Sequence, residues 1–426
     1  MILVYLLLLA LFLVTGMRLS RVKINNRFQN VLSPGLVLVV SYCMYSVAMP
    51  VSRLFFTNTD TDYDVEYMEV QILGAAGILI GLYFQRLYHR FKKNRNSAQV
   101  LQTYMPMPAI VIMTVAVGMV MFFALKGLGW EFSAIFNPRS YVASPQTGNP
   151  EQTLFGAILW VLAISSTVLA FIGANNTKNR KLLIFTLSVV GLFCTYYLLR
   201  GARLNAGMMV LPLICVYLYL KPINRKTFLL SCLGLYFFIY AVGLVRDVGF
   251  ARIADVSFKI QEFDPLTQEF GTNYSVFTKW KLMGQDNASL LLGKSYTTDV
   301  LYNMVPRYFW PERPDTAAVQ FSMDYYGVSN ASELTSAFGF SPVVEALVNF
   351  GVIGLVPVFA LFSFLVGLFE IWFMRKGVWG LACYAFMIPM VINWNRMDMA
   401  IAVKIFIIYL VVSKFFSLLM YRGRTV

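Results

Sequence analysis

Arginines at the ends of apolar runs are the residues of this chain best suited to chemistry. Arg200 and Arg203 end one run in the stretch LLRGARLNAG, and they share a face of a helical turn because they are three residues apart. Gly201 lies between them and would let a ligand approach the backbone. Arg246 ends a later run, and Arg252 follows it. Such guanidinium groups can clamp a phosphate or a carboxylate through paired hydrogen bonds.

Purely structural roles would also explain these arginines. Salt bridges, for instance to Asp247 or Asp255, would explain them without a ligand, and so would snorkelling to lipid headgroups. Most basic residues avoid the exoplasmic side of a membrane, so arginines on that side oppose the positive-inside rule and need a specific explanation. Both interpretations stand at this point.

A second candidate pair occurs in the stretch SPVVEALVNFGVIGL. Glu345 and Asn349 are four residues apart there, which puts both on one face of a helix. An acid in the first turn also suits the helix dipole, so Glu345 has a structural alternative. Trp310, in the stretch VPRYFWPERPD, has the structural alternative of an aromatic anchor at the membrane interface.

Metal and thiol chemistry have little support. The single histidine, His89, lies in a cluster of basic residues, and the five cysteines fall in apolar runs without a CxxC pair. Asp60, Asp62 and Asp64 alternate, but the glycine and glutamate of a calcium loop do not follow. No glycine-rich phosphate loop or nucleophile elbow occurs. Carboxylates could still hold Mg²⁺ or Mn²⁺, but we expect neither a metal site nor a cofactor.

The elements that must position these residues are membrane helices. Of the 426 residues, 58% are hydrophobic and 13% are charged, against about 25% charged in soluble domains. The net charge of +14 resides mainly in short turns beside apolar runs, which excludes a nucleic-acid-binding face. We predict an all-α integral membrane protein with a polytopic bundle of about eleven transmembrane helices. The predicted spans are residues 2–16, 31–50, 69–85, 105–124, 153–173, 181–199, 205–220, 226–244, 342–372, 378–393 and 397–418.

Charge fixes the predicted orientation. Six loops on one side contain Lys and Arg but no Asp or Glu: residues 17–30, 85–100, 174–181, 221–227, 374–377 and 421–426. Nearly all of the 21 acidic residues fall on the other side. The positive-inside rule therefore makes the six loops cytoplasmic, with the N-terminus outside and the C-terminus inside.

The predicted spans and loops divide the chain into three regions. Residues 1–245 hold the first eight helices with short loops, residues 246–341 form one large exoplasmic loop, and residues 342–426 hold the last three helices. Within the loop, the apolar spacing of residues 288–304 predicts short amphipathic helices on the membrane or over the bundle. Prolines in the following stretch rule out a continuous helix there. So long a loop in a membrane protein is usually a functional lid or site.

This chain resembles the Wzy-type O-antigen or capsular oligosaccharide repeat-unit polymerases. The resemblance rests on the large exoplasmic loop, RGAR at an arginine-bearing helix mouth, VPRYFWPERP late in the loop, and EALVNFGVIGL at the start of the next span. It covers most of the chain as architecture and a short part as motifs. The paired R-x10-G pattern described for some members is absent, so the arginine roles of that motif do not carry over.

The resemblance implies a GT-C-like enzyme at the outer face of the bacterial inner membrane. Such enzymes transfer a growing glycan from its undecaprenyl diphosphate to the terminal sugar hydroxyl of a new lipid-linked unit. No metal or sugar nucleotide is implied, and the partners are the lipid-linked donor and acceptor, membrane lipid and a possible regulator of chain length. Cationic groups stabilise the leaving diphosphate, and a carboxylate can take the hydroxyl proton.

Site residues follow from that implied reaction. Arg200, Arg203, Arg246 and Arg252 are the expected clamp, with Arg307 and Arg313 reaching down from the loop as second choices. Glu345 is the first candidate for the proton acceptor, with Asp247 and Asp315 behind it. Tyr308 and Trp310 could stack on sugars, and Asn349 could contact substrate beside Glu345.

Two other functions compete. O-antigen ligases have a similar frame and donor, but that family uses a periplasmic histidine, and this chain has no exoplasmic histidine. A lipid-linked oligosaccharide flippase or another transporter should line a central cavity with charges from many spans. The predicted spans are nearly free of charge apart from Lys404 and residues at their ends. The pattern therefore favours an enzyme that works at the membrane interface.

Overall fold

Long apolar helices make up most of the chain in the computed structural model. Eight helices within its described residues are long and apolar enough to cross a membrane: α1, α2, α3, α6, α7, α14, α15 and α16. Two shorter apolar helices, α4 and α8, accompany them. The chain is thus a polytopic helical membrane protein. The described residues are 2–20, 23–24, 27–29, 32–56, 63–91, 107–126, 150–199, 203–221, 223–224, 226–227, 230, 270–284, 290–305, 309–331, 334 and 340–419.

The predicted spans coincide with helices wherever the structure describes them. Only the span predicted at 226–244 lies almost wholly outside the described residues. α3 begins at Tyr63 rather than at residue 69, because Asp64 and Glu66 suit the first turn of a helix. The long helices are α1 (Ile2–Leu19), α2 (Pro34–Phe56), α3 (Tyr63–Phe91), α4 (Met107–Lys126), α6 (Pro150–Asn176), α7 (Arg180–Leu199), α8 (Arg203–Leu220), α14 (Pro342–Met374), α15 (Gly377–Trp394) and α16 (Met399–Leu419).

Short helices form in the large loop. They are α11 (Thr272–Leu282), η5 (Lys294–Tyr296), α12 (Thr298–Met304) and α13 (Ala317–Tyr326). η5 and α12 fall in the range 288–304, where short helices are predicted, whereas α11 and α13 are not predicted. We call residues 290–305 and 309–331, which include η5, α12 and α13, the cap segment. It packs on the bundle through contacts of η5 and α12 with α16, and of η5 with α14.

A small sheet departs from the all-α prediction. Its strands are β1 (Lys23–Ile24), β2 (Arg27–Gln29) and β3 (Ile223–Asn224), all antiparallel in the order β1-β2-β3. Arg27 pairs with Asn224, so the sheet joins two of the predicted basic loops. A third basic loop meets them where Arg86 Nη1 donates a hydrogen bond of 3.2 Å to the carbonyl of Arg18. We call this end of the bundle the basic end.

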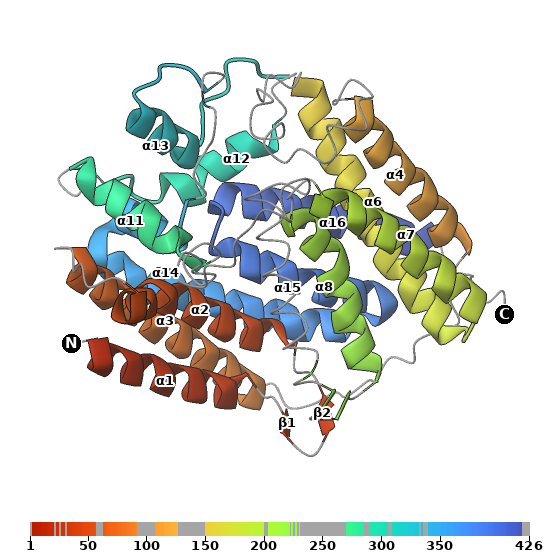
Figure 1. The fold of residues 1–426 in the computed structure, drawn as a ribbon, viewed down its shortest axis with the longest axis horizontal. Helices are drawn as coiled ribbons and strands as arrows, with labels where there is room; N and C mark the ends of the chain where they lie inside the picture. The colour runs from red at the N-terminus through yellow and green to blue at the C-terminus, as the bar shows by residue number, and fades with distance from the viewer. Residues whose placement is uncertain are drawn as a thin grey trace.

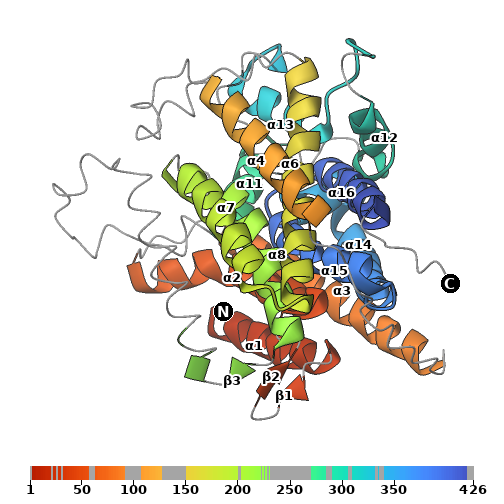
Figure 2. The same ribbon diagram turned by 90° about the vertical axis from the view of Figure 1, so that its right-hand side faces the viewer.

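The opposite end of the bundle carries buried polar side chains. We call it the polar end and define it by Ser295, Asp299, Glu345, Asn349 and Asp398, all of which are buried. Figures 1 and 2 show α12 and α13 of the cap segment at this end, far from β1 and β2. The fold therefore separates basic loops from buried acids along the bundle.

α15 is the central helix. It is apolar on nearly all sides and is surrounded by α2, α6, α8, α14 and α16 (Figure 1). A helix that is hydrophobic all round belongs in the interior of a bundle. By contrast, α1 and α7 leave apolar side chains such as Leu7 and Leu192 exposed, as expected of helices that face lipid.

α3 packs closely on α14 through glycines. A Cβ on Gly77 would come within 2.6 Å of the Val356 carbonyl, and one on Gly81 would overlap the Ala360 carbonyl. Small residues at such spacing let two membrane helices approach to backbone contact. This packing anchors the long second part of α14, whose first part carries the polar end.

Candidate functional site

The helix that carries Glu345 and Asn349 is broken at Gly351. The φ and ψ angles of Gly351 are 66° and −166°, a conformation that essentially only glycine adopts. The break takes the Val348 and Asn349 carbonyls out of the regular helical ladder. They instead accept hydrogen bonds of 3.0 Å from the backbone N–H groups of Leu291 and Leu292. The cap segment therefore closes the end of the half-helix that precedes Gly351.

Glu345 lies inside the molecule, at a junction of three elements. Its side chain is fully buried. Ser295 of η5 donates a hydrogen bond of 2.7 Å from its hydroxyl to Glu345 Oε1, and the Met399 N–H donates one of 3.1 Å to Oε2. Met399 is the first residue of α16, so the carboxylate sits at the positive end of that helix dipole. Glu345 thus links the cap segment, α14 and α16.

Asn349 completes this network from the next turn of α14. Its Nδ2 donates to Ser295 Oγ and to the Glu345 carbonyl, each at 2.7 Å. Its Oδ1 accepts from the Ser295 N–H at 3.4 Å. The two residues expected to share a helix face therefore meet at Ser295. Ser295 is far away in sequence, and the sequence analysis did not single it out.

Two further buried carboxylates lie near Glu345. Asp398 precedes α16, and its Oδ1 accepts a hydrogen bond of 2.8 Å from the Ile401 N–H. Asp299 on α12 accepts one of 2.8 Å, at Oδ2, from the N–H of Ala317 at the start of α13. Each acid therefore caps a helix N-terminus. Neither acid was predicted from the sequence, although Asp398 stands just before an apolar run, which is a recognisable capping signal.

Electrostatics within the cluster disfavour full ionisation. Burial raises the pKa of Asp398, the nearby charge of Asp299 raises it further, and the Ile401 N–H and the Thr316 hydroxyl act in the opposite direction. Burial also raises the pKa of Asp299, against the N–H of Ala317 and the charge of Lys294. Buried acids that share a site cannot all carry charge without penalty.

Arg313 serves the cap segment itself. Its Nη1 donates hydrogen bonds to the carbonyls of Tyr302 at 3.2 Å and Val305 at 3.0 Å, and to Asn303 Oδ1 at 3.4 Å. These contacts close the end of α12. The contact of Arg313 with diphosphate stays a prediction, and these hydrogen bonds add a positioning role within the cap segment.

The other described candidates lie near the same segment. Trp310 stands edge-on to Tyr302, with ring centroids 5.3 Å apart, and is partly exposed. Asp315 is half-buried in the segment that precedes α13. The hydrogen bonds of Glu345 come from Ser295 and Met399 instead. The structure therefore brings Asn349 to Glu345, and Asp398 rather than Asp315 lies beside them at the start of α16.

Arg203 is the first residue of α8, although its side chain lies outside the described part of the chain. Asn393, near the end of α15, donates a hydrogen bond of 2.9 Å to the sulfur of Met208 in the first turns of α8. The start of α8 therefore lies at the polar end, beside the turn that carries Asp398. Six other candidates lie outside the described residues: Arg200, Arg246, Asp247, Arg252, Arg307 and Tyr308.

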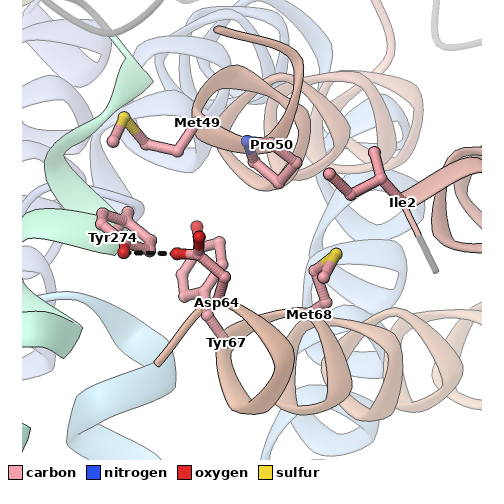
Figure 3. Close-up of a pocket in the computed structure, with 7 residues that line it drawn as sticks. All are labelled: Ile2, Met49, Pro50, Asp64, Tyr67, Met68 and Tyr274. Atoms are coloured by element: carbon pink, nitrogen blue, oxygen red, sulfur yellow. Dashed lines mark hydrogen bonds between the residues drawn. The ribbon is translucent and has the colours of Figure 1, made fainter. Parts of the chain in front are cut away.

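A pocket opens at the same end, between α1, α2, α3 and α11 (Figure 3). Asp64 faces Tyr274 there, and the tyrosine hydroxyl donates a hydrogen bond of 2.5 Å to Asp64 Oδ1. Most of the other lining side chains are apolar: Ile2, Met49, Pro50, Tyr67 and Met68. The pocket is separate from the Glu345 network, since no residue is common to both.

Among the described residues, no group of three His, Cys, Asp or Glu side chains is arranged to hold a metal ion. No family model, curated protein or solved structure matches the chain. The candidate site therefore rests on its own geometry: a buried carboxylate network centred on Glu345, closed by the cap segment at the polar end of a helical membrane bundle.

Proposed function

We propose that this protein polymerises undecaprenyl-diphosphate-linked oligosaccharide repeat units into O-antigen or a related surface polysaccharide. The polar end lies on the periplasmic side of the bacterial inner membrane, with the N-terminus periplasmic and the C-terminus cytoplasmic. The growing glycan moves from its lipid diphosphate to the terminal sugar hydroxyl of a new unit. The hydroxyl oxygen forms the new bond to the anomeric carbon, and the diphosphate leaves with the electrons of the broken bond.

Separation of charge along the bundle supports this orientation. The pairing of β2 with β3 and the contact of Arg86 with Arg18 bring three of the basic loops to one end. Asp299, Glu345 and Asp398 lie at the other end. Basic loops stay in the cytoplasm during insertion, so the buried acids belong to the outer face.

The single observation that carries the proposal is the buried Glu345 carboxylate beneath the cap segment. It is oriented by Ser295 and Met399, as a group that receives a proton must be. Opening of the cap segment would admit the acceptor sugar. The start of α8, at Arg203, lies at the same end and would provide the cation for the leaving diphosphate. A preorganised cation of that kind is worth about 10²–10³-fold in rate.

A deletion strain tests the proposal. We expect that loss of the gene converts the ladder of surface glycan on a gel into single-unit glycan, and that the wild-type gene restores the ladder. Glu345→Gln and Arg203→Ala should each reduce the polymer by about 10²-fold or more at normal protein levels. Asp324→Asn is the matched control, because Asp324 is an exposed acid of α13 that pairs with Gln320.

The outcomes of this experiment test the proposed function and the proposed site residues separately. A deletion strain that still makes the full ladder contradicts the polymerase. If the deletion leaves single units while Glu345→Gln and Arg203→Ala both give full ladders, the function stands and the site assignment fails. If the deletion removes single units as well, the protein acts before polymerisation or in ligation.

Transport of a lipid-linked oligosaccharide is the second candidate, because one observation favours it. Transporter sites are often built from broken helices that carry polar groups, and α14 is broken at Gly351 next to Asn349. A flippase predicts that the deletion strain accumulates lipid-linked units on the cytoplasmic side. A polymerase predicts that they accumulate on the periplasmic side, where an added glycosidase can reach them.

A further inference from the structure

Three buried carboxylates lie where the cap segment seats on the bundle. Asp299 belongs to the cap segment, whereas Glu345 and Asp398 belong to the bundle. Their exposed fractions are 1%, 0% and 3%. Transfer of several charges into a site of this kind is strongly unfavourable unless they are paired or neutralised.

Hydrogen bonds satisfy only part of this cluster. Glu345 receives bonds at both oxygens, from Ser295 and Met399. Asp398 Oδ2 and Asp299 Oδ1 are buried and have no hydrogen-bond partner among the described residues. The Thr316 hydroxyl favours the charged form of Asp398, yet it makes no hydrogen bond of good geometry. Acceptor oxygens thus outnumber the donors that reach them.

Positively charged residues lie around the three carboxylates, but they do not offset the unfavourable effect of burial on the charged form. Lys294 of η5 is exposed to solvent and favours the charged form of Asp299, but burial still raises the pKa of Asp299. Arg313 fastens the end of α12 and lies close enough to Lys404 for their charges to repel. Arg396 stands over the Tyr45 ring, 6.0 Å from its centroid.

The remaining titratable neighbour is Tyr296 of η5. Burial and the charge of Glu345 both raise its pKa, so its phenol stays neutral and adds no negative charge. The negative charge at this interface therefore comes from Asp299, Glu345 and Asp398.

We propose that the interface between the cap segment and the bundle is a proton-binding site, in which Asp299 and Asp398 together hold one proton when the cap is seated. The proton turns one acceptor oxygen into an O–H donor, which can bond to a neighbouring oxygen that now lacks a partner. It also removes the repulsion between a carboxylate of the cap and one of the bundle. Seating of the cap segment on the membrane helices is therefore coupled to proton uptake.

The sign of the coupling follows from the raised pKa of both acids. In the seated state Asp299 and Asp398 bind a proton more tightly than at their ordinary pKa of 3.8, which they regain when the cap is open and solvated. Seating is thus most favourable below that value and weakens as the pH rises through the raised pKa. One linked proton changes the opening equilibrium by at most about tenfold per pH unit.

Hydrogen exchange of the full-length protein in nanodiscs tests the proposal. Protection of the amides in residues 291–304 is measured from about pH 5 to about pH 8, after correction for intrinsic exchange. We expect the protection of wild type to fall as the pH rises through the raised pKa, by at most about tenfold per pH unit. Asp398→Asn and Asp299→Asn should each flatten the slope, because a neutral amide replaces the shared proton. Asp324→Asn is the matched control and should retain the wild-type slope.

Two results would overturn the proposal. One is wild-type protection of residues 291–304 that stays constant with pH, a result that does not depend on whether any variant folds. The other is an unchanged slope in both asparagine variants. A sodium titration at about pH 8 provides a further arm. Restoration of protection by Na⁺, with K⁺ as the control salt, would assign the site to a metal cation and reject the proton.

Discussion

The two parts of α14 on either side of Gly351 attach to their neighbours by different means. After Gly351, the helix lies against Gly77 and Gly81 of α3 with apolar close packing. Two hydrogen bonds join the helices there, from Ser363 Oγ to the Ile78 carbonyl at 3.1 Å and from Gln85 Nε2 to the Gly367 carbonyl at 3.5 Å. Before Gly351, attachment depends on Glu345 and on backbone carbonyls that bind the cap segment.

This difference separates a fixed frame from a part that can open. The close packing of α3 on α14 cannot be replaced by contacts with water, because separation of the two helices would only expose their backbones to lipid. The polar contacts of the first part can be exchanged for contacts with water when the cap segment leaves, and they depend on protonation. One helix therefore serves as an anchor in its second part and as a seat for the cap segment in its first.

The largest expected effect comes from breaking the anchor. Gly81→Leu would drive a side chain into the Ala360 backbone and force α3 from α14. We expect a loss of about 3 kcal/mol or more, with little folded protein. Thermal unfolding in detergent measures this effect. Gly191→Leu on α7 is the matched control, since nothing lies within 4 Å of a Cβ there. Equal stability of the two variants would refute close packing as the anchor.

A smaller effect is expected at the break itself. Gly351→Ala has no steric obstacle, so its cost is the backbone conformation alone, about 1–3 kcal/mol. If the helix straightens instead, the Val348 and Asn349 carbonyls leave Leu291 and Leu292, and the amides of the cap segment exchange faster while those of α3 do not. Gly327→Ala is the control, because its φ of 67° and ψ of 29° lie in the left-handed region at lower cost. Unchanged exchange at residues 291–292 would show that the break does not hold the cap.

The smallest effect concerns the fastening of α12. Arg313→Lys keeps the positive charge but loses the fork that reaches several acceptors at the end of α12. We expect a local loss of about 1 kcal/mol. Faster exchange confined to residues 298–305 would show it, with melting of the bundle unchanged. A variant that lowers the melting temperature of the whole protein instead would place Arg313 in the frame rather than in the cap.

Much of the frame could be predicted from sequence, because hydropathy and loop charge act locally. The helix that carries Glu345 and Asn349 was expected, and so was their common face. The break at Gly351 was not, since glycine inside an apolar run is tolerated in membrane helices. The small sheet was missed as well, because two strands of two residues leave no alternating pattern.

The contents of the site depend on contacts between distant segments, which no local pattern reveals. Ser295 is 50 residues from Glu345, and nothing in its neighbourhood marks it as the partner. Asp398 and Asp299 resemble ordinary helix caps, and only their shared burial distinguishes them. Arg313 was expected to bind a ligand because its residue type suits phosphate, whereas its contacts with the carbonyls at the end of α12 were not predicted.

The small sheet at the basic end has a consequence for the order of events during synthesis. β2 is made early, whereas its partner β3 follows only after α8. At ribosomal rates of 5–20 residues per second, the outer edge of β2 waits on the order of 10–40 s for that partner. An open strand edge invites pairing with other chains, and a very short edge limits that risk. Pairing of β3 with β2 would then connect the first helical hairpin to the middle of the bundle, at a time when the earlier helices are already in the bilayer.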